Sequence, residues 1–532
     1  MQQIIYIAIL IFIGTSTLNS QRADWTIQLE PITIDGLPGA QSYAFGTVDG
    51  YWIIVGGRVD GLHQRQPFAS FDPVDNNRDI ILIHPKKAQF WTTSLEVLPQ
   101  SLQEQLQSTN MQFHQNGNFL FVTGGYGYSE TEDEHITYPY ISRINLPLLK
   151  ESILAKSDIS SAFIQKDCNS CAVAGGRMEM INDAFYLVGG HYFYGRYNPH
   201  GPDHGPGFTQ VYTGEARIIE IQNFEDDFNY SFNQAIHDEL HLRKRDYNLV
   251  PQIRNGEELL VAFSGVFQQH VDLPYLYPVE IYQDRAIPIE SFAQYLNHYH
   301  CANVPIYDRK NDLMNNLFFG GIAQFYFEED ILIQDNYVPF VKTVANVSYS
   351  ESEGWIESKL ALEMPDYFGA GSEFILADNV PVYGNGVIKL MELDQKHELG
   401  YIYGGIKSSR PNIFWINNGS QSEATPVIFK VVLTQSNSVP QSDMALDDSY
   451  LIVVPNPNKG SFKLIYNSDA FKEVTISIKD MRGTNVVKMN TQNVLKGKNF
   501  INIDLPGFNK GVYLIQLESE GKQILRKVIV DN

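Results

Sequence analysis

Short apolar runs that end in a glycine doublet recur along most of the chain. Such a run, bounded by polar residues and glycine, predicts a buried strand, and glycine permits the positive φ of a sharp exit. The six copies read GYWIIVGG at 50–57, GNFLFVTGG at 117–125, DAFYLVGG at 183–190, ELLVAFSG at 258–265, NNLFFGG at 315–321 and ELGYIYGG at 398–405. In the fourth copy, Ser264 takes the place of the first glycine. A segment that recurs six times predicts a repeat architecture in which each copy is one structural unit.

Each copy stands inside a wider pattern of four strands. One short strand precedes the glycine-ended strand, as at 41–49, and two more follow it, as at 78–85 and 90–99. Six four-stranded units predict an all-β protein whose sheets close radially and leave only short edges. The sixth unit lacks a fourth strand, whereas the segment 24–32 has the required form and precedes the first unit. We expect this N-terminal strand to complete the sixth unit and close the ring.

The four-strand unit resembles the kelch repeat over residues 23–434. The resemblance rests on the glycine doublets and on strands that open with Trp and close with Leu, FWTTSLEVLP at 90–99 and GWIESKLALEMP at 354–365. It implies a six-bladed kelch-like β-propeller over 21–433, closed by the strand at 24–32.

The pattern changes after a polar linker at 434–449. Short alternating strands fill 450–532 and predict a small β-sandwich of the Ig-like kind. This segment resembles the type A C-terminal sorting domain of the type IX secretion system, in motifs that include Asn456, Pro457, Gly460, Phe462, Asp480, Met481, Gly483, Gly511, Tyr513 and Lys527. The resemblance implies that the type IX secretion machinery is a partner, and that the chain is secreted or attached to the outer surface of the cell.

The N-terminus carries an apolar run at 4–13 followed by small and polar residues. Its length is typical of a signal peptide and too short for a membrane span, so we expect a signal peptide over 1–20 and a mature protein that does not span the membrane. In an exported chain, Cys168 and Cys171 are candidates for a disulfide, whereas Cys301 is expected to be a buried thiol.

Charge argues against nucleic acid as a partner. The net charge of the chain is −22, and the segment after 450 is +5, so the body carries −27. A body this acidic repels a phosphate backbone.

The long loops after the glycine doublets and before the inner strands are expected on one face, where binding usually resides. Tyr212 and twelve residues of these loops offer aromatic contact area, directed hydrogen bonds or metal-ligand chemistry. The twelve candidates are Arg58, Tyr126, Tyr128, His191, Tyr192, Tyr194, Arg196, Tyr197, His200, His204, His298 and His300. We expect this face to bind a glycan or a protein, although the same aromatic residues could simply pack the loops onto the body.

An enzyme is the alternative class. Galactose oxidase is a kelch-type copper enzyme, but its set of two Tyr, two His and a crosslinked Cys does not align with this sequence. The acidic loops at 72–79 and 130–134 could offer oxygen ligands to Ca²⁺ but lack the DxDxDG spacing. A carbohydrate-active hydrolase or lyase is a further alternative, and the sequence contains no GxSxG or HExxH motif. We therefore assign no catalytic residue, no metal and no cofactor, with Ca²⁺ and copper as the alternatives.

Overall fold

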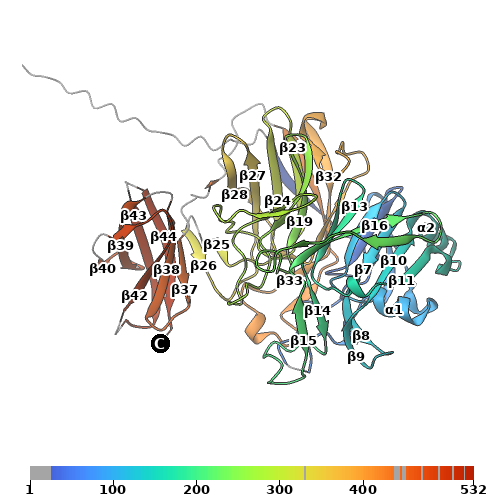
Figure 1. Cartoon of the computed structure of the whole chain (residues 1–532), viewed down its shortest axis with the longest axis horizontal. Coiled ribbons are helices and arrows are strands. Elements are labelled where there is room, and N and C mark those ends of the chain that lie inside the picture. Colours follow the sequence, from blue (N-terminus) through green and yellow to red (C-terminus); the bar gives the residue numbers. More distant parts are fainter. Residues whose placement is uncertain are drawn as a thin grey trace, which may run out of the picture.

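The computed structural model describes residues 25–66, 68–328, 331–435, 444–445, 451–468, 471–488, 492–505, 508–519 and 522–531. The expected signal peptide and most of the expected linker lie outside these residues. The described chain is all-β, with a large N-terminal body and a smaller C-terminal part beside it (Figure 1).

The body contains six antiparallel four-strand meanders among the described residues. The first three consist of β2 (Ala44–Val48), β3 (Tyr51–Val55), β4 (Asp79–His84) and β5 (Gln89–Ser94); β6 (Gln112–Asn116), β7 (Phe119–Thr123), β10 (Tyr140–Asn145) and β11 (Phe163–Asp167); and β12 (Arg177–Ile181), β13 (Ala184–Val188), β16 (Glu215–Gln222) and β17 (Asn229–Phe232), where β18 (Ile236–His237) also pairs with β16.

The other three units follow the same order. They consist of β19 (Asn248–Arg254), β20 (Glu257–Phe263), β21 (Val279–Ile281) and β22 (Ala286–Pro288); β23 (Asn303–Asp308), β24 (Leu313–Phe319), β27 (Thr343–Ser350) and β28 (Gly354–Glu363), extended by β31 (Ile388–Lys389) and β36 (Met444–Ala445); and β30 (Glu373–Leu376), β32 (Lys396–Tyr403), β35 (Ile428–Gln435) and β1 (Trp25–Ile32).

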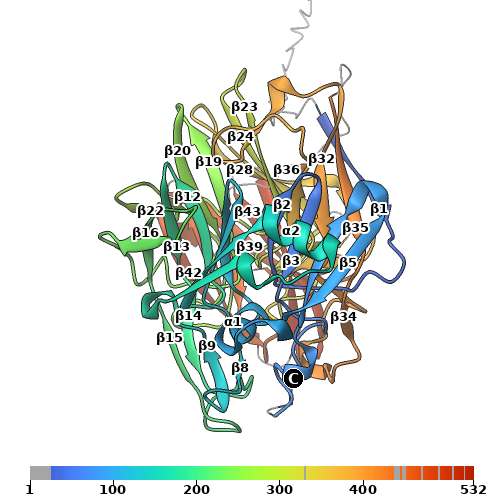
Figure 2. The same cartoon turned by 90° about the vertical axis from the view of Figure 1, so that its right-hand side faces the viewer.

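The sixth unit combines the two ends of the body. Strand β1 pairs antiparallel with β35 over its whole length, with Trp25 opposite Gln435 and Ile32 opposite Ile428 (Figure 2). Strand β1 therefore supplies the fourth strand of this sheet.

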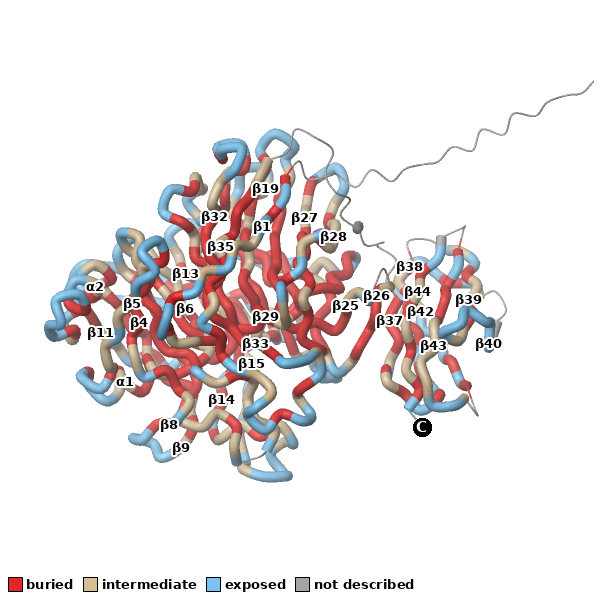
Figure 3. Tube along the Cα trace, turned by 180° about the vertical axis from the view of Figure 1, so that it is seen from behind, coloured by how far each residue is buried: buried red, intermediate tan, exposed pale blue. Residues whose placement is uncertain are grey.

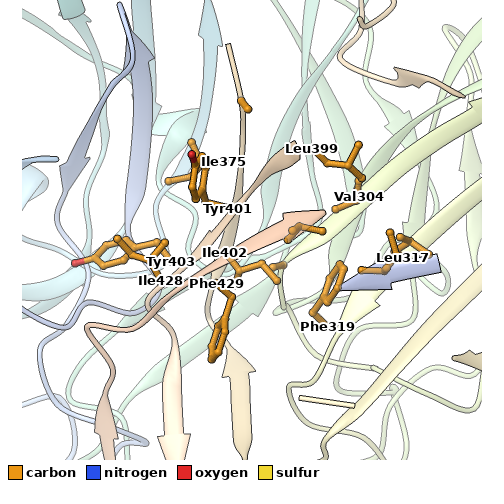
Figure 4. Packing of buried hydrophobic residues seen from close by; sticks show 14 of the residues in the cluster. Val304, Leu317, Phe319, Ile375, Leu399, Tyr401, Ile402, Tyr403, Ile428 and Phe429 are labelled. Carbon is orange, nitrogen blue, oxygen red and sulfur yellow. The ribbon is translucent and has the colours of Figure 1, made fainter. Parts of the chain in front are cut away.

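Hydrophobic clusters join each unit to the next. One cluster contains residues of the first and second units, and others join the second to the third, the third to the fourth and the fourth to the fifth. A further cluster joins the fifth and sixth units, which contribute Phe319 and Tyr401 (Figure 4). Trp52 of the first unit belongs to the same cluster. Packing of this kind removes from water the apolar side chains that lie between neighbouring sheets.

The glycine doublets end the second strand of their units, as the sequence predicts. Gly124 has φ +63° and lies so close to a neighbouring loop that a Cβ atom there would stand 2.0 Å from the carbonyl oxygen of Val173. Only glycine tolerates this combination of positive φ and close backbone approach.

Several smaller elements lie outside the six four-strand meanders. A second sheet has the order β15 (Thr209–Tyr212), β14 (His191–Tyr194), β9 (Glu134–Thr137) and β8 (Tyr126–Ser129), and projects from the body (Figure 1). The remaining strands of the body are the hairpin β25 (Phe325–Glu328) and β26 (Ile331–Gln334) and the sheet β29 (Tyr367–Ala370), β33 (Ile406–Ser408) and β34 (Ser422–Ala424). The described residues form two α-helices, α1 (Gln100–Leu106) and α2 (Leu146–Ala155).

The C-terminal part has two sheets around one core. They are β37 (Leu451–Val454), β38 (Ser461–Ser468) and β42 (Gly497–Asp504), and β39 (Lys472–Asp480), β40 (Asn485–Lys488), β41 (Gln492–Val494), β43 (Gly511–Ser519) and β44 (Lys522–Val530). Residues of both sheets share one hydrophobic cluster, so this part has its own core.

Candidate functional site

Six backbone amides form a closed cycle of hydrogen bonds, to which each unit of the body contributes one residue. Each of the six residues stands two or three positions before the inner strand of its unit. The N–H groups donate in the order Ser42 to Gly371 (2.9 Å), Gly371 to His300 (3.0 Å), His300 to Asp246 (2.8 Å), Asp246 to Gly175 (2.8 Å), Gly175 to Asn110 (3.1 Å) and Asn110 to Ser42 (3.1 Å). The segments that enter the six units therefore meet around one common axis, which we call the axial cycle.

Two charged residues from the third and sixth units pair beside the axial cycle. Arg177 Nη1 and Nη2 donate to the two carboxylate oxygens of Glu373 at 3.0 and 3.1 Å, and His300 Nε2 lies 3.1 Å from Glu373 Oε1. Burial alone would raise the pKa of Glu373, but Arg177 and His300 outweigh burial and hold this pKa at about 2. Glu373 is therefore a carboxylate at neutral pH.

A small cavity of about 20 Å³ lies at this point, with Arg177, Asp246, His300 and Glu373 among its lining residues. Its size corresponds to roughly one water molecule. Asp246 keeps 31% of its side-chain surface accessible. Burial raises its pKa, and the nearby Arg245 and His300 act against that rise. The cavity thus holds two carboxyl groups in different surroundings.

Three tyrosines and two arginines gather next to Asp246, and all five side chains are half-buried. The guanidinium carbon of Arg243 lies 3.9 Å from the centre of the Tyr212 ring, and Arg243 Nη1 donates to the carbonyl of Phe267 at 2.7 Å. Arg245 Nε lies 3.6 Å from Asp246 Oδ2. We call this group the Arg–Tyr cluster; it consists of Tyr197, Tyr212, Arg243, Arg245 and Tyr299.

His191 contacts the Arg–Tyr cluster through Arg245. Its Nδ1 atom lies 3.1 Å from Arg245 Nη1 and 2.6 Å from Gln210 Nε2. Burial, then Arg245 and Arg243, hold the pKa of His191 well below its usual range. The imidazole is therefore neutral and accepts a hydrogen bond from Arg245, which fixes the guanidinium in place.

The Arg–Tyr cluster has the chemistry of a recognition surface. Guanidinium groups donate directed hydrogen bonds to carboxylates, hydroxyls or carbonyls, and tyrosine rings offer flat apolar faces with a polar edge. Tyr212 ends strand β15, Tyr197 lies in the loop between β14 and β15, and the other three side chains come from the loops that enter the fourth and fifth units. Neighbouring units thus supply one surface beside the axis.

Several of the residues singled out in the sequence pack the loops together. Arg58 is 2% exposed and pairs with Asp60 at 2.7 Å. The hydroxyl of Tyr126 donates to the carbonyl of Gly195 at 2.8 Å and accepts from the amide of Tyr197 at 2.9 Å. The hydrogen bonds of Tyr126 join the exit loops of the second and third units, whereas Arg58 and Asp60 pair within the exit loop of the first.

Two other candidates also contact loop neighbours. The hydroxyl of Tyr128 donates to Asp133 at 2.5 Å, and Arg196 Nε donates to the carbonyl of Ser70 at 2.7 Å. Arg196 Nη2 also lies 3.8 Å from Asp72 Oδ2.

The histidines of the loops do not converge. His298 is fully buried, where its Nδ1 accepts from the amide of Gln324 at 3.0 Å, and burial lowers its pKa to about 4. His300, two residues on, faces Glu373 instead, and His200 and His204 lie exposed at the tip of a long loop. Over the residues that the structure describes, no group of three or more His, Cys, Asp and Glu side chains could hold a metal ion.

Tyr192 and Tyr194 lie on one face of β14, which alternates between inside and outside. Their side chains are 38% and 43% exposed, while those of His191 and Phe193 point inward.

Cys168 and Cys171 form a disulfide, and Cys301 is a buried free thiol.

The sequence did not single out Arg177, Arg243, Arg245, Asp246, Tyr299 or Glu373. A usable signal existed, because most of these residues stand just before or at the start of an inner strand, in register with the repeat. Superposing the six copies on the glycine doublets would have placed these positions next to the axis.

The residues of the predicted sorting motif shape the C-terminal part. Asn456 and Phe462 are buried, and Gly460 and Gly483 have positive φ. Asp480 Oδ1 accepts from the amides at 482 and 484, which closes the turn that contains Met481. The other residues of the set are Pro457, just after Asn456, Gly511 and Tyr513 on β43, and Lys527 on β44.

A family model of the secretion system C-terminal sorting domain matches residues 452–531. No curated protein matches the chain. Among solved structures, that of YjhT is similar with a TM-score of 0.40 and 10% identity, over 74% of this chain and 97% of that chain. A family 43 glycoside hydrolase, the arabinoxylan arabinofuranohydrolase of Bacillus subtilis solved with cellotetraose, has a TM-score of 0.24 and 12% identity, over 92% of this chain and 94% of that chain.

The C-terminal part is thus a sorting domain, and it directs the chain through type IX secretion to the cell surface or the extracellular space. None of the helices in the described ranges is long and apolar enough to cross a membrane.

Proposed function

We propose that the exported chain is a binding module that recognises a glycan or a protein through the Arg–Tyr cluster. The observation that carries this proposal is that three tyrosine rings and two guanidinium groups gather beside the axial cycle. Aromatic faces with directed donors are the usual means of binding oxygen-rich ligands and protein surfaces.

The body that presents this cluster is a six-bladed kelch-type β-propeller in our proposal, closed by β1. The closed cycle of six amides and the clusters that join each unit to the next support this assignment. The two sheets around one core likewise support an Ig-like sandwich for the sorting domain.

A carbohydrate-active enzyme is the second candidate. Asp246 and Glu373 line the same small cavity, and the environment raises the pKa of one carboxyl and lowers that of the other. Carboxyl groups with divergent pKa values are the arrangement that acid–base catalysis uses.

The test uses the purified secreted protein on an array of glycans and on extracts of surface proteins, with bound copper and calcium measured on the same sample. Retention of a ligand that is recovered unchanged supports the binding module. Turnover of a bound glycan that is lost in Asp246→Asn supports the enzyme instead. Stoichiometric copper lost in His191→Ala and His300→Ala would favour an oxidase over both.

Export has a separate test, which removes the C-terminal domain and leaves the expected signal peptide and the body in place. A chain truncated before Tyr450 is expected to stay inside the cell. Its appearance in the medium by type IX secretion would contradict the sorting role.

A further inference from the structure

The sorting domain presents an open sheet edge to the body. Strand β37 is an edge strand of its three-stranded sheet, because β38 alone pairs with it among the strands that the structure describes. Edge strands carry unpaired N–H and C=O groups that attract further chains, and proteins cover such edges to prevent unwanted pairing. The hairpin β25–β26 of the body lies against the sorting domain here (Figure 3). Strand β26 is next to β44, and the side chain of Gln334 reaches β37.

A single side chain of the hairpin pairs with the edge. Gln334 Nε2 donates to the carbonyl of Val453 at 2.7 Å, and Gln334 Oε1 accepts from the amide of Val453 at 2.8 Å. The side-chain amide thus behaves as a peptide group of a neighbouring strand would. Gln334 is fully buried, so water does not compete for these bonds.

Two residues of the sorting motif belong to the same contact. Asn456 Nδ2 donates to the backbone carbonyl of Gln334 at 2.9 Å, and the carbonyl of Asn456 accepts from the amide of Asn336 at 3.2 Å. Lys527 Nζ lies 2.8 Å from Glu328 Oε2 on the hairpin. In this arrangement the hairpin and the residues just after it contact both Asn456 and Lys527.

Apolar packing completes the interface. Ile452 of β37 is 5% exposed and shares a hydrophobic cluster with Leu276, Tyr295, Phe325 and Leu332 of the body. Arg526 lies over the ring of Tyr295 at 5.4 Å. Paired hydrogen bonds, a buried apolar anchor and an ion pair on the rim are the features of a specific interface.

We propose that the hairpin β25–β26 is an intramolecular docking site that caps the β37 edge and masks Asn456 and Lys527. Secretion machinery that reads these residues must displace the hairpin first. This masking goes beyond the proposed ligand binding and is independent of it, since the Arg–Tyr cluster contributes no residue to the contact.

Hydrogen exchange of the full chain tests the docking. The amide of Val453 is expected to be protected, and Gln334→Ala is expected to raise its exchange rate at least tenfold while β39 keeps its protection. Gln103→Ala, on helix α1 in the connection between the first and second units, is the matched control and leaves Val453 unchanged. Equal exchange at Val453 in wild type and Gln334→Ala would overturn the docking.

A zero-length carbodiimide crosslink provides a second measurement that needs no variant. It is expected to join Glu328 to Lys527 in the wild-type chain, as it joins the pair Glu30 and Lys430 within the body, whose side chains lie 2.5 Å apart. Formation of the second crosslink without the first contradicts the docked arrangement.

Export rates test the masking. Gln334→Ala with an open β37 edge is expected to leave the cell at least as fast as wild type, because its motif is already exposed. Slower export of a variant whose body and sorting domain are both folded would show that the machinery reads the docked form, and would overturn the masking.

Discussion

The guanidinium of Arg177 donates two hydrogen bonds to the carboxylate of Glu373, at 3.0 and 3.1 Å, although 196 residues separate them along the chain. Arg177 begins the inner strand of the third unit, and Glu373 begins that of the sixth. In a cycle of six units these two positions face each other across the axis. The pair therefore ties opposite sides of the body together.

Removal of one partner of this pair is expected to destabilise the fold. Glu373→Leu leaves Arg177 as a buried charge without its carboxylate, which costs about 3–5 kcal/mol of unfolding free energy. The double variant Arg177→Met with Glu373→Leu is expected to recover most of this loss. Denaturant unfolding at pH 7 measures both. A loss below about 1 kcal/mol in the single variant contradicts a structural role for the pair.

The same pair predicts how stability depends on acid. The pKa of Glu373 is about 2 in the folded chain, against about 4.3 for an unperturbed glutamate. A lowered carboxyl pKa contributes stability above the unfolded value, and this contribution is lost as pH falls from about 4.3 towards 2. Denaturant midpoints measured from pH 6 to pH 2.5 should therefore fall more steeply for wild type than for Glu373→Gln.

The N-terminal strand is expected to hold the sixth unit together. Ile27 on β1 is 6% exposed and stands opposite Leu433 of β35. Ile27→Asp places an unpaired charge in this core, so we expect a loss of more than about 3 kcal/mol. Thr26→Asp lies on the exposed face of the same strand and is expected to change stability by less than about 0.5 kcal/mol. Equal effects of the two variants would contradict a closing role for β1.

Glycine is required where the second strand leaves its unit. Gly124→Ala forces a Cβ to within 2.0 Å of a backbone carbonyl at φ +63°, and we expect it to cost at least about 1–3 kcal/mol. Gly117→Ala is the control, because Gly117 also has positive φ but has open space around it. Thermal melts should show a clearly larger fall in melting temperature for Gly124→Ala than for Gly117→Ala. Equal falls in the two variants would contradict the steric argument.

The repeat was readable from the sequence because short apolar runs and glycine doublets are local signals. The strand at 24–32 could be assigned to the last unit for the same reason, since its Trp-to-Leu form matches an outer strand. The axial residues could not be found in this way. Arg177 and Glu373 acquire their meaning only when the units surround an axis, and finding them requires the superposition of all six copies, because no single local pattern carries that information.

The loop histidines show the opposite difficulty. His298 and His300 look like a pair of ligands in the sequence, because residues two apart share one face of a strand. The segment forms no strand, however, and it bends at Tyr299 between the two histidines. His298 is consequently buried against Gln324, while His300 faces Glu373. Tyr126 likewise looks exposed in a loop rich in glycine, yet the packing of three loops buries it. Residue type alone did not separate loop packing from recognition.

Recognition through the Arg–Tyr cluster depends most on Arg245, which reaches His191, Asp246 and the tyrosines at once. Arg245→Met is expected to reduce affinity for the array ligand at least tenfold, which corresponds to about 1.4 kcal/mol. Arg245→Lys keeps the charge but loses the planar fork, so it should recover only part of the affinity. Arg285→Met, an exposed arginine outside the cluster, is the control. Unchanged affinity in a folded Arg245→Met, measured by titration calorimetry, would place recognition elsewhere on the body.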